Sequence, residues 1–85
     1  MASVYQVEIE NSAARAIQRL QRHDQVRIVA KINALATDPR PSTKLSGTES
    51  AYRIRIGDYR VVYIVEDSVR IVTVTRVAHR REVYR

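Results

Sequence analysis

The sequence contains no cysteine, tryptophan or phenylalanine, and its 85 residues include only two glycines and two prolines. The absence of cysteine excludes a disulfide framework, a zinc–thiolate site and a cysteine nucleophile. The chain also lacks an apolar run long enough to span a membrane, and its N-terminus has no signal-peptide core. We therefore expect a cytoplasmic protein with few loops.

The remaining composition is that of one folded domain. Apolar residues make up 45% of the chain, which argues against intrinsic disorder. A chain of 85 residues is long enough to bury a single modest core but not two. We therefore predict a single domain over residues 1–85.

The charge is strongly positive and is carried mostly by arginine. Lysine and arginine total 15 against nine acidic residues, a formal net charge of +6, and only Lys31 and Lys44 are lysines. The planar guanidinium group suits bidentate contact with phosphate and stacking on nucleic-acid bases. This composition predicts a polyanionic partner.

The clearest pattern runs from Tyr52 to Tyr63 and predicts two antiparallel strands joined by the two-residue turn Gly57-Asp58. Glycine followed by a polar residue favours such a turn because glycine adopts a positive φ without steric cost. The turn also sets the register of the two strands. The expected partners are Ile56 with Tyr59, Arg55 with Arg60, Ile54 with Val61, and Tyr52 with Tyr63.

Side chains alternate between the two faces of a sheet, so this hairpin has an apolar face and a basic face. The basic face carries Arg53, Arg55 and Arg60. Two of these cations, Arg55 and Arg60, are expected directly opposite each other, an arrangement that is destabilising by itself. We therefore interpret this face as a binding surface for an anion.

The flanking segments predict a strand over residues 4–9, two amphipathic helices and a further strand over residues 69–77. Asn11 or Ser12 is the expected N-cap of the first helix, Asp24 that of the second, and Asp38-Pro39 is expected to end the second helix. The fold class is therefore α+β. A strand and a two-helix hairpin precede a three-stranded antiparallel meander, with the helices on one face of a twisted sheet.

The last strand is expected to extend the basic face. If Asp67-Ser68 is a two-residue loop, Ile64 lies opposite Ile71, Val62 opposite Thr73 and Arg60 opposite Thr75. Thr73, Thr75 and Val77 then share the face of the arginines, while Val72 and Val74 join the core. The end of the chain, with His79, Arg80 and Tyr84, is expected beside the same face.

Three features together resemble the RelE/ParE toxin superfamily. They are the order of the elements, the phrase from Tyr52 to Tyr63, and the ending from Val77 to Tyr84. The resemblance covers nearly the whole chain, and the central phrase is shared across the superfamily. The terminal His-Arg-x-x-x-Tyr pattern is similar to that of the RelE branch, whose members are messenger-RNA endonucleases that act on the ribosome.

The resemblance implies the toxin of a type II toxin–antitoxin system. Such a toxin cuts messages on the ribosome and thereby inhibits translation, and an acidic antitoxin encoded beside it holds it inactive in a complex. The reaction needs neither a metal nor another cofactor, and the sequence has no glycine-rich phosphate loop and no metal-ligand cluster. The catalytic residues implied by position are Arg53, Arg55, Arg60, His79, Arg80 and Tyr84.

The general base stays open. Some members have lysine at the positions of Arg53 and Arg55, whereas a guanidinium stays protonated and cannot accept the proton of a ribose 2′-OH. The base is then His79, Tyr84, Glu82 or a group of the ribosome. Two alternatives of the same fold are a ParE-like inhibitor of DNA gyrase, which has no catalytic chemistry, and a nucleic-acid-binding domain that cuts nothing.

Overall fold

The computed structural model describes residues 4–39 and 51–79, and nothing below concerns the structure of the others. In the described chain the elements follow in the order β1 (Gln6–Ile9), α1 (Asn11–Gln18), α2 (Arg22–Ala34), β2 (Ala51–Ile56), β3 (Tyr59–Glu66) and β4 (Ile71–His79). Neither of these helices is long and apolar enough to cross a membrane.

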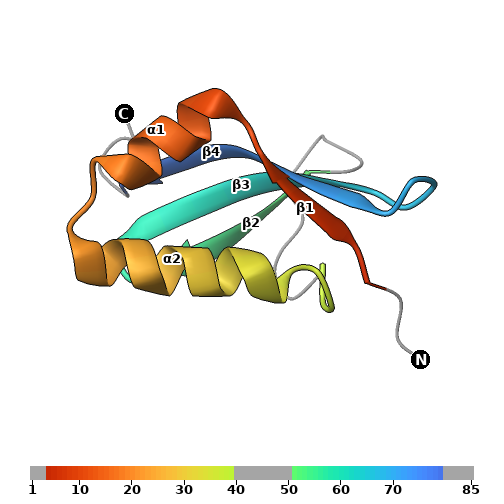
Figure 1. Cartoon of the computed structure of the whole chain (residues 1–85), viewed down its shortest axis with the longest axis horizontal. Helices are drawn as coiled ribbons and strands as arrows, with labels where there is room; N and C mark the ends of the chain where they lie inside the picture. Colours follow the sequence, from red (N-terminus) through yellow and green to blue (C-terminus); the bar gives the residue numbers. More distant parts are fainter. Residues whose placement is uncertain (1–3, 40–50, 80–85) are drawn as a thin grey trace.

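The strands form one mixed sheet, and both helices lie on the same face of it (Figure 1). The strand order is β1-β4-β3-β2, so the first strand pairs with the last. β1 runs parallel to β4, whereas β2, β3 and β4 form an antiparallel meander. The predicted α+β architecture is confirmed. The strand order could not be predicted from the sequence, and it follows from the pairing of β1 with β4.

The central hairpin has the register that its turn predicts. Arg55 pairs with Arg60, and the other three predicted pairs of β2 and β3 are also present. Gly57 has a φ of 59°, which an L-residue with a side chain rarely adopts. A Cβ atom at this position would also lie only 3.2 Å from a guanidinium nitrogen of Arg27, which reaches over the turn from α2. The positive φ is therefore what favours glycine here, since the exposed tip of Arg27 can shift by a few tenths of an ångström.

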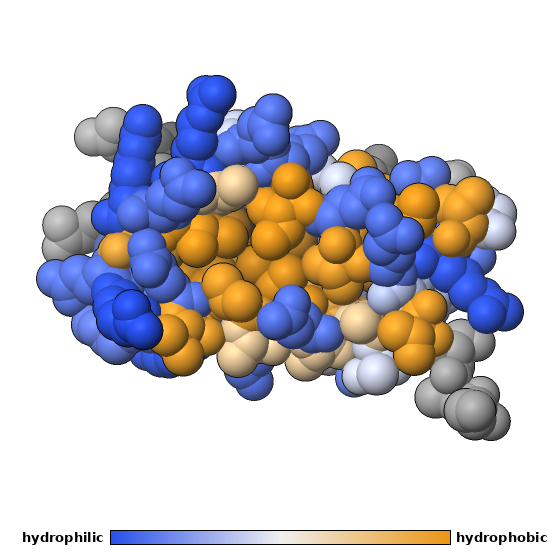
Figure 2. Space-filling model, in the orientation of Figure 1, coloured by the Kyte–Doolittle hydropathy of each residue, from blue (hydrophilic) through white to orange (hydrophobic). Residues whose placement is uncertain are grey.

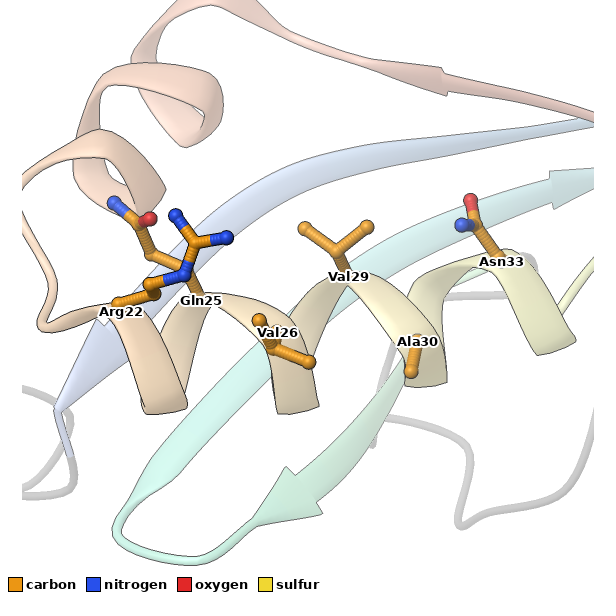
Figure 3. A pocket seen from close by; sticks show the side chains of 6 residues that line it. All are labelled: Arg22, Gln25, Val26, Val29, Ala30 and Asn33. Carbon is orange, nitrogen blue, oxygen red and sulfur yellow. The ribbon is translucent and has the colours of Figure 1, made fainter.

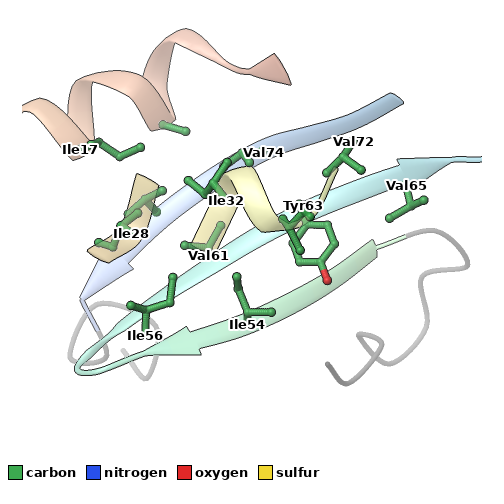
Figure 4. Packing of buried hydrophobic residues seen from close by; sticks show 13 residues of the cluster. Ile17, Ile28, Ile32, Ile54, Ile56, Val61, Tyr63, Val65, Val72 and Val74 are labelled. Atoms are coloured by element: carbon green, nitrogen blue, oxygen red, sulfur yellow. The ribbon is translucent and has the colours of Figure 1, made fainter. Parts of the chain in front are cut away.

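The core lies between the two helices and the helix-facing side of the sheet (Figure 4). The predicted apolar face of the central hairpin forms the sheet side of this core, and Tyr63 and Val61 are fully buried there. Tyr52 stacks on Tyr63 with a ring-centroid distance of 5.8 Å, which is the favoured offset arrangement of two aromatic rings. From α2, the buried side chains are Ile28 and Ile32.

Both predicted helix caps are wrong. The N-cap residues are Glu10 for α1 and Gln21 for α2, and neither side chain makes a capping hydrogen bond. Asp24 lies inside the first turn of α2, where its carboxylate interacts favourably with the positive end of the helix dipole. The helices therefore begin earlier than their polar residues indicate.

The connection between β3 and β4 is longer than predicted. Glu66 pairs with Ile71, so four residues form the loop instead of the two in the predicted turn. The start of β1 and the residue before it hold the loop. The Tyr5 hydroxyl donates to the Asp67 carboxylate, and the backbone N–H of Gln6 donates to the Arg70 carbonyl oxygen at 2.8 Å. Arg70 closes the loop with a φ of 55°. The predicted pairing of Ile64 with Ile71 is therefore wrong, and Ile64 pairs with Thr73.

A β-bulge then changes the side to which the end of β4 points. The ladder pairs Tyr63 with Val74 and Val62 with Arg76, so Thr75 is the extra residue on β4. The Thr75 hydroxyl donates to the Val62 carbonyl oxygen at 3.2 Å. Beyond the bulge, Val77 pairs with Val61 and is buried in the core, being only 7% exposed. The prediction that Val77 shares the arginine face is therefore wrong.

This register predicts a clear difference between two valines of the same region. Val77→Ala removes buried apolar surface and leaves a cavity, so we expect a loss of about 2 kcal/mol in the free energy of unfolding and of about 10 °C in melting temperature. Val69→Ala is the matched control, because Val69 is 57% exposed in the loop. Thermal unfolding followed by circular dichroism measures both. Equal melting temperatures for the two variants would contradict the register.

Candidate functional site

Arginines gather on the face of the sheet opposite the helices. Arg55 of β2 pairs with Arg60 of β3, and Arg60 pairs in turn with Ala78 of β4. Residues directly opposite in an antiparallel pair have Cβ atoms about 5 Å apart. Ala78 has a small side chain and is itself buried, as is Arg60. This row therefore brings two cations together next to a residue that takes up little space.

The neighbouring row adds two more cations. Arg53 pairs with Val62, and Val62 pairs with Arg76 on its other side. Arg53 and Arg76 are therefore two strand spacings apart, about 9.6 Å between Cα atoms. Each is also a diagonal neighbour of Arg60, a relation that places residues about 7–8 Å apart. Hence four guanidinium groups belong to two adjacent rows of one sheet face.

Reasoning from the sequence missed Arg76. A regular β4 would direct Arg76 to the core side, together with Val72 and Val74, and only the bulge moves it to the arginine face. A signal was nevertheless present, because the apolar residues recur at Val72, Val74 and Val77, a step of two followed by a step of three. Such a change of phase within one strand is what a bulge produces.

Arg60 is the buried member of the cluster. It is 7% exposed and is the one charged residue classed as buried in residues 4–39 and 51–79. Arg53 is partly buried, whereas Arg55 and Arg76 are exposed. Burial of a cation carries a desolvation cost, and the neighbouring Arg55 adds repulsion. A bound anion would offset part of both costs.

Charge is polarised along this face. The four arginines lie towards the β2–β3 turn, whereas the acidic strand residues Glu8 and Glu66 lie towards the other end. Glu8 pairs with Thr73, and Glu66 pairs with Ile71 next to the β3–β4 loop. An anion approaching this face is therefore attracted to the arginine end and repelled from the opposite end.

His79 lies on the other face of the sheet. It pairs with Tyr59, and its ring meets the Tyr59 ring edge to face with a centroid distance of 5.3 Å. Tyr59 packs against the core, and both residues line a small pocket with Leu20 and Arg19 at the end of α1. The prediction that His79 lies beside the arginines is therefore wrong, since the bulge directs its side chain to the helix side. Arg80 and Tyr84 lie outside the described residues.

A second surface runs along α2. Figure 2 shows apolar side chains gathered in the middle of the helix-covered face, with hydrophilic ones around them. Val26 and Val29 are 59% and 38% exposed, and Gln25 points from α2 towards α1, donating to the Ile17 carbonyl oxygen at 3.0 Å. An open groove of about 470 Å³ lies here (Figure 3). It is lined by Arg22, Gln25, Val26, Val29, Ala30 and Asn33.

The fold and the arginine face define a class of small basic α+β proteins, and comparison with known proteins identifies the family. Residues 7–84 match the model of the ParE toxin of the type II toxin–antitoxin system parDE. A protein described as toxin RelE1 of Methanocaldococcus jannaschii is 29% identical over 86 residues, which cover 95% of this chain and 96% of the relative.

Solved structures agree with that match. A chain of the archaeal RelE–RelB complex from Pyrococcus horikoshii is 30% identical and has a TM-score of 0.82, covering 91% of this chain and 96% of that one. A chain of the intact RelBE toxin–antitoxin complex from E. coli is 26% identical with a TM-score of 0.80, covering 88% and 95%. The chain belongs to the RelE/ParE superfamily of type II toxins. It is a toxin of the RelE type.

The burial of Arg60 predicts a difference between two variants that both remove its charge. Arg60→Met fills most of the volume with an apolar side chain of similar length, whereas Arg60→Ala leaves it unfilled, so we expect Arg60→Ala to melt below Arg60→Met. Thermal unfolding measures both. Equal melting temperatures would mean that the side chain of Arg60 is not packed in the fold.

Proposed function

We propose that this protein is a ribosome-dependent messenger-RNA endonuclease that inhibits translation without a metal or other cofactor. The observation that carries the proposal is the cluster of Arg53, Arg55 and Arg60 on one face of a rigid sheet. Guanidinium groups bind phosphate oxygens in a bidentate manner, and strands hold them more precisely than loops do. The relatives of RelE type support the assignment. The terminal residues His79, Arg80 and Tyr84 resemble the ending of the RelE branch.

The proposed reaction is an in-line attack within the RNA. The ribose 2′-oxygen loses its proton to a base and forms a bond with the adjacent phosphorus, while the bond from phosphorus to the 5′-oxygen of the next nucleotide breaks. The products are a 2′,3′-cyclic phosphate and a 5′-hydroxyl that receives a proton. Negative charge builds up on the phosphate during this step, and cations already fixed in place stabilise it.

This electrostatic role belongs to the four arginines that the resemblance to RelE toxins implies, namely Arg53, Arg55, Arg60 and Arg80. Arg60 contacts the scissile phosphate, Arg53 and Arg55 hold the RNA on the β2 side of it, and Arg80 adds a further positive charge. Tyr84 stacks on the reacting nucleotide. None of these guanidinium groups can serve as the base, because arginine stays protonated. The proton therefore goes to His79, Glu82, Tyr84 or a group of the ribosome.

The proposed partner is an acidic antitoxin. The relatives from Pyrococcus horikoshii and E. coli are in complexes with RelB, and this chain carries a net charge of +6. An acidic segment neutralises the arginine face, and an apolar helix of the same partner fits the groove on α2, where Val26 and Val29 are exposed. Covering the arginines would inhibit the toxin by excluding RNA.

One observation favours a second function. The matching family model is that of ParE toxins, and this fold supports both messenger-RNA cleavage and the poisoning of DNA gyrase. A gyrase poison needs only a binding surface, for which a strongly basic sheet face is also suited. The two functions differ in what the arginines touch, namely RNA in one case and a protein–DNA complex in the other.

Expression in cells separates these functions. We expect the wild-type protein to halt translation and to leave messages cut at defined sites with 2′,3′-cyclic phosphate ends, which end mapping of cellular RNA detects. Arg60→Met should lower cleavage about 100-fold or more, as the loss of one donor to a developing negative charge does. Inhibition of purified gyrase with intact messages would instead establish the ParE-like function, and intact messages with active gyrase would leave only nucleic-acid binding.

The position of His79 leads to a prediction about the base. Its ring lies against Tyr59 on the helix side, so we expect His79→Gln to lower the cleavage rate less than tenfold and to leave the dependence of the rate on pH unchanged. Single-turnover cleavage on programmed ribosomes over a pH series measures this. A loss of 100-fold or more together with an altered pH profile would establish His79 as the base and would show that its ring turns towards the RNA.

A further inference from the structure

We infer that Arg76 is an additional RNA-contacting residue, which binds the phosphate of a nucleotide next to the cleavage site. The inference rests on the proposed function and deepens it. Arg76 reaches the arginine face only because the bulge at Thr75 shifts the register of β4. Without that extra residue, alternation would direct the side chain to the core side of the sheet, where a cation is not tolerated.

The position of Arg76 mirrors that of Arg53. Both pair with Val62, one from β4 and the other from β2, so they lie on opposite sides of β3 in the same row. Both are diagonal neighbours of Arg60, about 7–8 Å from it. If Arg60 holds the scissile phosphate, Arg53 and Arg76 are placed to hold the chain on its two sides.

The side chain of Arg76 is available for this contact. It is exposed, and no ion pair or hydrogen bond connects it to another residue within 4–39 or 51–79. Its neighbours on that face are Val62 opposite it, Ala78 two residues along β4 and Arg60 on the diagonal, and none of these three is acidic. The acidic strand residues Glu8 and Glu66 lie towards the other end of the sheet, so neither of them competes with phosphate for the guanidinium.

A phosphate contact away from the reacting atoms affects binding more than chemistry. We therefore expect Arg76→Gln to raise the toxin concentration for half-maximal cleavage roughly tenfold, the effect of losing one charge-assisted hydrogen bond, while the maximal rate stays within twofold. Arg76→Lys should recover most of the loss, because it keeps the charge. Arg15→Gln is the matched control, since Arg15 is exposed on α1, on the helix side of the sheet and outside the groove on α2. It should match the wild type.

The experiment has two measurements with the full-length protein. The first is cleavage of a capped message in a translating extract as the toxin concentration is varied. The second is the fluorescence anisotropy of a 20-nucleotide single-stranded RNA with 2′-O-methyl riboses, which cannot be cut. In a series of salt concentrations, Arg76→Gln should reduce the slope of log K against log salt by about 0.7, as expected for one lost contact with a single-strand phosphate. Arg15→Gln should leave the slope unchanged.

Each outcome decides the matter. If the wild type cuts messages and Arg76→Gln behaves as Arg15→Gln does in both measurements, the role of Arg76 is overturned while the proposed function stands. A loss of maximal rate as large as that of Arg60→Met would also overturn it, because Arg76 would then act on the reacting phosphate. If the wild type neither cuts messages nor binds the RNA, the proposed function fails and the inference fails with it.

Discussion

The pairing of β4 with β3 is the constraint on which the rest of the molecule depends. It is held at one end by β1, through the contacts of Tyr5 and Gln6 with the β3–β4 loop, and in the middle by the hydrogen bond from Thr75 to Val62. The bulge at Thr75 changes the phase of the strand by one residue. As a result the core residues of β4 are even-numbered before the bulge, at Val72 and Val74, and odd-numbered after it, at Val77.

The consequences of this one residue reach both faces. On the helix side it places Val77 in the core and the His79 ring against Tyr59. On the open side it places Ala78 beside Arg60 and Arg76 beside Val62. A regular strand would have exchanged these side chains between the faces, with a charge directed into the core. The bulge therefore serves the core and the arginine face at the same time.

The two faces of the sheet differ in how much their side chains contribute to stability. The helix side is packed for stability, with aromatic stacking of Tyr52 on Tyr63 and aliphatic side chains from α2 above them. The open side accepts the unfavourable approach of Arg55 to Arg60 and the burial of Arg60. Local arrangements that lower stability are common at functional sites, where the ligand compensates for them. A scaffold of this kind can support different activities, because activity depends on the side chains placed on a fold rather than on the fold itself.

The sequence by itself determined the central hairpin, the grouping of Arg53, Arg55 and Arg60, and the α+β class, because a two-residue turn and strict alternation are local properties. Only the tertiary structure decided the helix starts, the four-residue loop, the place of Val77 and the inclusion of Arg76 in the cluster. These features depend on contacts between distant segments, such as that of Tyr5 with Asp67 and that of Thr75 with the strand beside it. A change in register of a single residue reverses every later side chain, and the energies that select it come from packing that no local pattern contains.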